Sequence, residues 1–350
     1  MKRIVLAGAG HAHLVVLRAI AAQPLYGASV TLVSPYPRQV YSGMLPGLIA
    51  GHHAVEDVLV DVAGLAARVQ AEFVQGAVDA LDATARRVRL NDGREIEYDY
   101  LSLNVGSLVS GGGLPGGGLG LPVKPFEPFL GALDGESFSR VAVVGAGAAG
   151  MEVAMALAYR GAAVTLYADK PTLPAVLVER AERRIRRVGV DYRPGMPVSA
   201  LEPGPVVVAG AARQEFDHVI LSTGLAPAPF LAASGLFCTE RGYVRVAPTL
   251  RSLSHDRVFA AGDCATVHET PHPKSGVYSV RHGEILAANL RAVVLGTELK
   301  TYQPQKKSLQ ILTCGSRHAI ALRGERVVEG WWVWRWKNWI DRRWMRSLRP

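Results

Sequence analysis

The chain has 350 residues, which is enough for two domains of ordinary size, each with its own core. Its formal net charge is +9, but residues 331–350 hold six basic side chains against one acidic one, so the remainder is only mildly basic and a nucleic-acid binder is not favoured. The three cysteines are widely spaced and include no C-x-x-C pair, which excludes a disulfide framework and suits a reducing compartment. No uncharged run reaches 18 residues, so we expect no membrane-spanning helix.

A strand, a glycine turn and a helix are predicted at the N-terminus, which therefore belongs to the fold rather than to a signal peptide. The strand is Lys2–Ala7, the turn contains Gly8 and Gly10, and an apolar helix runs from Leu14 to about Ala22. His13 stands where a phosphate-binding turn normally has its third glycine. The next strand, 28–33, ends at Ser34, where a carboxylate normally accepts a hydrogen bond from a ribose; the serine hydroxyl is a weaker substitute.

The following residues predict a cover and a small antiparallel unit. Residues 41–51 form an apolar, glycine-punctuated loop, which suits the covering of a flat aromatic ligand. Residues 72–91 alternate in polarity and turn at Asn91-Asp92-Gly93 into 94–99, which predicts an antiparallel excursion. A fourth buried strand, 100–105, ends at Gly106, and the glycine-rich residues 106–120 are interpreted as a domain connector.

Residues 140–169 form the strongest signal, a complete strand, glycine turn, helix and second strand. Gly145, Gly147 and Gly150 give G-x-G-x-x-G, in which the first glycine permits the turn, the second lets backbone approach a pyrophosphate and the third brings the helix close to the strand. The N-H groups at the start of the helix 148–160 favour a phosphate anion. The elements expected beyond it are a basic helix 179–188, short strands near 206–209, a buried strand 217–224 that stops at Gly224, a strand within 242–246, a strand 257–261 that delivers Gly262 and Asp263 to a sheet edge, and a helix 279–295.

This order of motifs resembles the two-dinucleotide flavoproteins related to pyridine nucleotide-disulfide oxidoreductases. GAGHAHL, YSGMLPGLIAGH, LSLNVGS, LPVKP and KSGVYSVRHG look like the type II NADH dehydrogenase-like branch, including the flavoprotein module found beside selenide water dikinase. The resemblance implies an α/β fold of two Rossmann-like domains, as in glutathione reductase. The FAD-binding domain would comprise residues 1–108 and 225–300, the inserted NAD(P)-binding domain 109–224, and a C-terminal appendage 301–350.

The same resemblance implies two cofactors and their contacts. FAD would lie on the first turn, and NAD(P)H would bind as a substrate on the second. Lys124 and Glu152 would be the catalytic residues, near the junction of the two cofactors. The implied cofactor-binding residues are Gly8, Gly10 and Ala12 at the FAD pyrophosphate, Ser34 at the ribose, Leu45 and Pro46 at the isoalloxazine, Gly106, Gly262 and Asp263 around the ribitol, and Gly145, Gly147, Gly150 and Gly224 for NAD(P)H.

Three departures from the family pattern shape the expected activity. No redox cysteine pair is present, which also counts against sulfide oxidation. Residues 276–282 replace the Ala-Gln-x-Ala-x-Gln sequence that type II dehydrogenases place near the quinone. Asp169 lies one position beyond the place where a carboxylate selects NADH, and we still expect NADH to be preferred. The predicted activity is hydride transfer from NAD(P)H to FAD and electron transfer to a quinone or other small acceptor. The alternative is a non-enzymatic or partner-dependent flavoprotein, a redox sensor or selenium-metabolism accessory.

The histidines and the tail complete the prediction. His11, His13, His52 and His53 lack a recognised metal-ligand spacing, so no metal is expected. All six tryptophans lie in residues 331–344, and a helix would align Trp332, Trp336, Ile340, Trp344 and Leu348 in one stripe. Such a helix suits a membrane surface or a docking face on the body or a dimer partner, and residues 331–336 could instead form an edge strand. We expect a cytoplasmic protein, for which a peripheral position on the cytoplasmic face of the membrane is the alternative that the tail allows.

Overall fold

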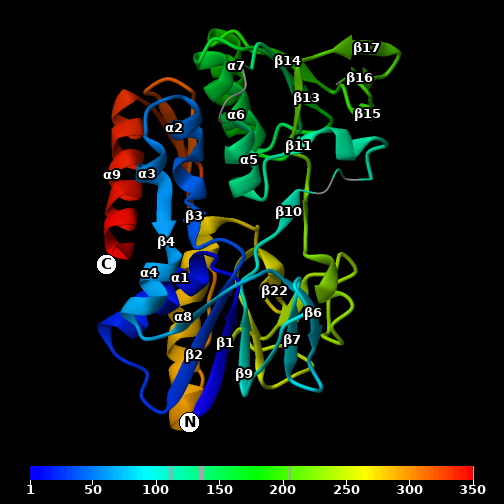
Figure 1. Cartoon of the computed structure of the whole chain (residues 1–350). Helices are drawn as coiled ribbons and strands as arrows, with labels where there is room; N and C mark the ends of the chain where they lie inside the picture. The colour runs from blue at the N-terminus through cyan, green and yellow to red at the C-terminus, as the bar shows by residue number, and fades with distance from the viewer. Residues whose placement is uncertain (110, 112, 134–137, 205, 350) are drawn as a thin grey trace.

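The computed structural model describes residues 1–109, 111, 113–133, 138–204 and 206–349 (Figure 1). It is a mixed α/β structure built on two five-stranded parallel sheets, which confirms the predicted fold class. A three-stranded antiparallel sheet and a long helix follow at the C-terminal end.

The first sheet has the order β21-β9-β1-β2-β5, and all its pairings are parallel. Its strands are β1 (Lys2–Ala7), β2 (Ala28–Ser34), β5 (Glu72–Gln75), β9 (Tyr100–Leu103) and β21 (Val258–Ala260). A strand from residues 258–260 therefore joins a sheet whose other strands all lie within residues 2–103. Two helices, α1 (His11–Ala22) and α8 (Gly276–Leu295), pack against each other beside it, and α8 ends at Gly296 in a left-handed conformation with φ of 73°.

The second sheet has the order β11-β18-β12-β13-β14, again entirely parallel. Its strands are β11 (Leu121–Pro122), β12 (Arg140–Val144), β13 (Ala163–Ala168), β14 (Asp191–Pro194) and β18 (His218–Leu221). The helices of this unit are α5 (Phe126–Leu133), α6 (Ala148–Tyr159) and α7 (Ala175–Arg187). An antiparallel sheet of β15 (Val198–Glu202), β16 (Val206–Ala209) and β17 (Ala212–Glu215) adjoins it.

Two local expectations need correction. Residues 41–51 are not a loop, because they form η1 (Ser42–Met44) and α2 (Leu45–Ile49), with Pro46 in the first turn where its missing N-H leaves no helical bond unmade. Residues 72–75 pair with β2 in the main sheet, so the antiparallel excursion contains only β6 (Val78–Asp82), β7 (Arg87–Leu90) and β8 (Glu95–Glu97). The remaining short elements are β3 (Arg38–Val40), α3 (Val55–Val58), β4 (Leu59–Asp61), α4 (Val62–Arg68), β10 (Leu108–Val109), η2 (Gly117–Leu119), β19 (Leu225–Ala226), η3 (Pro229–Leu231), β20 (Val244–Val246), η4 (Gly262–Cys264) and β22 (Ala265–Val267).

The C-terminal region connects the two halves of the molecule. Its strands β23 (Leu309–Thr313), β24 (Ala319–Arg323) and β25 (Arg326–Gly330) lead into α9 (Trp331–Leu348), so the strand alternative for residues 331–336 is wrong. Leu312 and Ile320 belong to the hydrophobic core around the second sheet, whereas Met345 and Leu348 belong to the core around the first. Figure 1 shows α9 alongside the segment that carries η1 and α2. Within the described residues, no helix has the length and apolar character that crossing a bilayer requires.

Candidate functional site

The first glycine turn is fixed by Asn104, a residue that the sequence reasoning did not single out. Its Oδ1 accepts from the N-H groups of Ala12 (3.0 Å) and His13 (3.2 Å), and its Nδ2 donates to the carbonyl of Ala261 at the end of β21 (2.7 Å). A Cβ atom on Gly8 or Gly10 would overlap Asn104, so both positions require glycine. The Ala12 N-H, which was expected at a pyrophosphate, is therefore already engaged by protein.

His13 fills the place of the third glycine without opening the turn. The ring is buried and joins two elements, with Nε2 2.8 Å from Ser102 Oγ on β9 and Nδ1 against the carbonyl of Gly8. Burial lowers the pKa of His13 to about 4, although the bond to Gly8 works in the opposite direction. The imidazole is thus neutral at physiological pH and acts as a structural bridge between the turn and the sheet.

The second glycine turn keeps its backbone open. Gly145 has φ of 105°, and a Cβ there would lie 2.5 Å from the carbonyl oxygen of Ser222, while Gly150 packs directly on Gly145. At Gly147 the nearest atom to an added Cβ is Thr172 Oγ1, 3.5 Å away, and a Cβ added to Gly224 would meet no atom within 4 Å. Gly147 is also the N-cap of α6 and has no side-chain cap. Open backbone at an uncapped helix start fits a phosphate-containing ligand.

Lys124 and Asp263 form an ion pair at the edge of the first sheet. The distance from Lys124 Nζ to Asp263 Oδ2 is 2.9 Å, and Ser107 Oγ lies 3.1 Å from the same oxygen. Burial acts to raise the pKa of Asp263, but the Lys124 ammonium and the hydrogen bonds from Lys124 and Ser107 together hold it below its ordinary value. Asp263 follows Gly262, whose N-H donates to His282 Nδ1 (3.0 Å). Gly106, which directly precedes Ser107, has a φ of 73°.

Glu152 lies on α6 and is engaged by the C-terminal sheet. Its Oε1 accepts from both the N-H and the Oγ1 of Thr313, each at 2.8 Å. Burial raises the pKa of Glu152, while Lys337 on α9 and the bonds from Thr313 act to lower it. Lys124 and Glu152, which were expected together at the cofactor junction, therefore have different partners, Asp263 and Thr313.

The other expected FAD contacts lie around the first sheet and α2. Ser34 ends β2, and its hydroxyl donates to the carbonyl of Tyr36 (3.1 Å), so it already closes a local turn. Leu45 and Pro46 are buried, and their helix α2 packs against α6 of the second unit. This packs the segment expected to face an isoalloxazine against the second unit.

Sequence reasoning also missed two charged residues on α9. Lys337 and Asp341 are paired at 2.7 Å, with side chains that are 12% and 8% exposed. The signal in the sequence was the spacing, because the single acid of residues 331–350 follows a lysine by one helical turn.

The predicted stripe is divided on α9, since Trp332 and Trp336 are exposed whereas Leu348 is buried. Val333, Asp341, Met345 and Leu348 face the protein, whereas four tryptophans remain exposed, namely Trp331, Trp332, Trp336 and Trp339. The guanidinium groups of Arg335 and Arg343 lie over the rings of Trp331 and Trp339, at 5.9 and 5.5 Å. The helix therefore docks on the body through one face and presents a Trp/Arg face, formed by these six residues, to the outside.

The histidines that the sequence analysis singled out have separate partners. His52 Nε2 lies 2.8 Å from the carbonyl of Gly315, and His13 makes the contacts described above. Across the part of the chain that the structure describes, no three His, Cys, Asp or Glu side chains gather as a metal-binding group.

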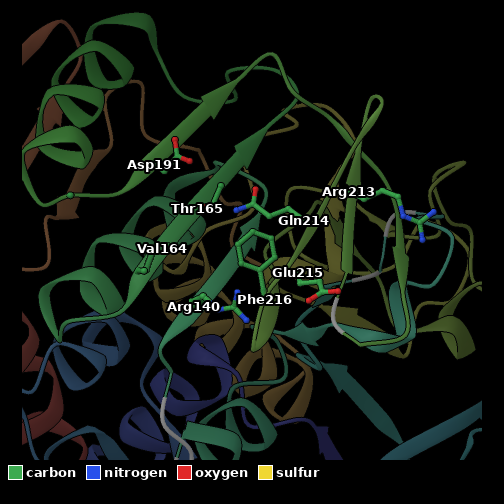
Figure 2. A pocket seen from close by; sticks show the side chains of 10 residues that line it. Arg140, Val164, Thr165, Asp191, Arg213, Gln214, Glu215 and Phe216 are labelled. Atoms are coloured by element: carbon green, nitrogen blue, oxygen red, sulfur yellow. The ribbon is translucent and has the colours of Figure 1, made fainter.

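A surface depression of about 540 Å³ lies at the edge of the second sheet where its strands begin, opposite the edge that carries the glycine turn (Figure 2). Arg140, Thr165 and Asp191, which lie near the amino ends of their strands, line it with Arg213 and Glu215. Its arginines have partners, since Arg140 pairs with Asp217 at 3.2 Å and Arg213 pairs with Glu202. The depression is thus separate from the glycine turn at the carboxyl edge.

Two parallel sheets, one with a glycine turn and a helix after β1 and the other with a glycine turn and a helix after β12, define a protein that binds two dinucleotides. The chain belongs to the pyridine nucleotide-disulphide oxidoreductase family, whose model matches residues 2–283.

Similar proteins were found by sequence and by structure. The chain is 29% identical to ferroptosis suppressor protein 1 of Taeniopygia guttata over 256 residues, 66% of each protein, and 29% identical to an NADH dehydrogenase-like protein of Mycobacterium tuberculosis over 236 residues, 60% of this chain and 59% of that one. It thus spans about two thirds or less of these relatives. The sulfide:quinone oxidoreductase of Aquifex aeolicus superimposes with a TM-score of 0.80 at 19% identity, covering 100% of this chain and 92% of that one, which shows a shared fold.

Proposed function

We propose that the protein is an FAD-dependent NAD(P)H oxidoreductase of the type II NADH dehydrogenase-like kind. It takes hydride from NAD(P)H onto FAD and passes electrons to a quinone or another small acceptor. The observation that carries this proposal is the pair of glycine turns, one on each parallel sheet, together with the ion pair of Lys124 and Asp263, which joins the two units. The names of the relatives support it, since they include an NADH dehydrogenase-like protein.

The residues of each unit have separate tasks in this proposal. Gly8 and Gly10 let the backbone approach FAD, and Asp263 accepts hydrogen bonds from its ribitol, while Gly147 and Gly224 leave room for NAD(P)H. When bound, FAD supplies the hydride-accepting and electron-passing chemistry. Leu45 and Pro46 exclude water, and Lys124 keeps Asp263 ionised so that it remains an acceptor. The proposed units are residues 1–108 with 225–300, residues 109–224, and residues 301–350.

No cysteine pair takes part in the proposed reaction. Cys238, Cys264 and Cys314 are free thiols, and burial raises the pKa of Cys264 to about 11 and that of Cys314 to about 12. Such thiols stay protonated and are poor nucleophiles at neutral pH. Electrons would therefore pass from FAD to the acceptor directly.

The Trp/Arg face on α9 is proposed to bind the surface of a membrane, which would give access to a quinone. Tryptophan favours the bilayer interface and arginine pairs with anionic headgroups. The face is exposed while the opposite face of the same helix is docked, so contact with lipid needs no unfolding of α9. The proposed location is the cytoplasm, with the protein bound peripherally to the cytoplasmic face of the membrane. NADH is the proposed nicotinamide, because the carboxylate of Asp169 just beyond β13 would repel a 2′-phosphate.

Rapid mixing of the FAD-loaded protein with NADH or NADPH tests the proposal. Fast bleaching of the flavin absorbance, followed by reoxidation with a soluble quinone, is the expected result. Slow reduction without turnover on any quinone would instead indicate a redox sensor or a selenium-metabolism accessory, which residues 276–282 allow because they lack the usual quinone-site sequence. Absence of bleaching by either nucleotide would rule out the dehydrogenase.

A further inference from the structure

A buried group of polar side chains joins α9 to the segment before α2. Lys337 Nζ lies 2.7 Å from Asp341 Oδ2 and also donates to the carbonyl of Gly43, while Tyr41 OH donates to Asp341 Oδ1 over 3.1 Å. A Cβ on Gly43 would strike the Tyr41 ring, so the ring packs directly on the glycine whose carbonyl accepts from Lys337. Both charges of the pair are thus held by residues just ahead of Leu45 and Pro46.

The pair is poorly explained by stability alone. Ion pairs withdrawn from water lose hydration that their attraction only partly returns, and well-packed apolar residues often serve stability as well or better. Here the pair acts on its surroundings: Lys337 lowers and Asp341 raises the pKa of Glu152 on α6, whose own burial raises it most. Tyr41 also lies 5.6 Å from the ring of His11, in the first glycine turn. The pair is therefore placed among the elements that surround the proposed FAD site.

We propose that Lys337 and Asp341 tune the reduction potential of the bound FAD in opposite directions, and that Asp341 is a positioning residue for Lys337. This inference rests on the proposed function. Reduction adds negative charge to the isoalloxazine, so a fixed cation at low dielectric favours the reduced form and a fixed anion favours the oxidised form. The cation raises the potential and the anion lowers it, and the carbonyl of Gly43 together with Asp341 keeps the ammonium in place.

Spectroscopic titration of the FAD-loaded protein against reference dyes measures the potential without any turnover. We expect Lys337→Gln to lower the midpoint potential, Asp341→Asn to raise it, and the double variant to return close to the wild-type value. A tenfold change in the relative binding of reduced and oxidised FAD corresponds to about 30 mV for a two-electron couple. The control is Glu179→Gln, which breaks the exposed pair with Arg183 on α7 and should leave the potential unchanged.

Opposite signs separate electrostatic tuning from structural damage, because a loosened site would move the potential of both variants in one direction. Equal-sign shifts, or unchanged potentials in variants that retain FAD, overturn the inference and leave the proposed function intact. Should Asp341→Asn fail to fold, Lys337→Gln decides alone, and an unchanged or raised potential overturns the inference. A wild-type protein that binds no FAD overturns the proposed function and this inference with it.

Discussion

The Lys124 ammonium and the Asp263 carboxylate lie 2.9 Å apart although they are 139 positions apart in the chain. Lys124 precedes α5 at the entry to the second unit, and Asp263 follows β21 in the first sheet. One ion pair therefore connects the two nucleotide-binding units at the place where their cofactors are proposed to meet.

Asp263→Asn should weaken FAD binding by about tenfold or more, because a hydrogen bond to a charged group contributes about 1.5–3 kcal/mol. Lys124→Met should leave the Asp263 carboxylate in place but raise its pKa, since burial then acts unopposed by the cation. As the pH is lowered, the FAD affinity of Lys124→Met should therefore begin to fall at a higher pH than the FAD affinity of the wild type. Fluorescence titration of apoprotein with FAD between pH 4 and pH 8 measures both effects, and affinities with the same pH dependence in wild type and Lys124→Met would contradict the assigned contact.

His13→Gly should destabilise the protein, although it restores the usual third glycine. The folded-state pKa of His13 is lowered to about 4, so the unfolded chain takes up a proton that the folded chain does not between pH 6.5 and pH 4. The contribution of His13 to stability is complete above pH 6.5 and declines as the pH falls through that window, by at most about 1.4 kcal/mol per pH unit. Urea unfolding at several pH values measures it; a wild-type minus variant difference that does not shrink on acidification would show that His13 is not buried and neutral.

Asn104→Ala should lower the free energy of unfolding by about 1–3 kcal/mol or more, because it leaves two N-H groups of α1 and the carbonyl of Ala261 without their partner. Asn91→Ala is the matched control, since the Asn91 amide makes one exposed bond, to the N-H of Ala77. Urea denaturation of both variants is the measurement. Equal losses in the two variants would contradict the central position of Asn104.

Gly147→Ala and Gly145→Ala should separate binding from folding. An added methyl at Gly147 meets no atom nearer than 3.5 Å, so this variant should keep its thermal stability and lose affinity for NADH. At Gly145 the methyl would strike the carbonyl of Ser222 in a backbone with φ of 105°, so stability should fall first. Calorimetry and NADH titration distinguish the two outcomes, and full NADH affinity in Gly147→Ala would remove that turn from the proposed site.

Replacement of Trp331, Trp332, Trp336 and Trp339 by serine should abolish flotation with anionic liposomes without changing the melting temperature, because these side chains are already exposed. Phe237→Ser is the control, as this ring is 51% exposed elsewhere on the surface. Wild-type protein should also float less at high salt, which screens the arginines. Concentration-dependent dimerisation of the wild type that the substitutions abolish, without any flotation, would identify a second copy as the partner instead.

Sequence reasoning predicted the two parallel sheets well, because buried strands such as Val141–Val144 are apolar runs bounded by glycine turns, a purely local signal. It was less successful where packing decides. Residues 41–51 read as a loop because of their glycines, yet they form η1 and α2 against the second unit. The orientation of α9 also escaped, since Lys337 and Asp341 are buried by partners about 300 positions away in sequence, and a helical projection contains no information on them. The roles of Asn104 and His13 depend on the same kind of distant contact.

Because the last fifty residues pack into both hydrophobic cores, the protein should not tolerate a C-terminal truncation. Leu312 and Ile320 complete one interior, and Met345 and Leu348 complete the other, so a version cut at residue 300 would leave apolar gaps in both halves at once. Such a fragment should aggregate rather than survive as a smaller working protein, and purification handles are better placed before Met1 than grafted within α9.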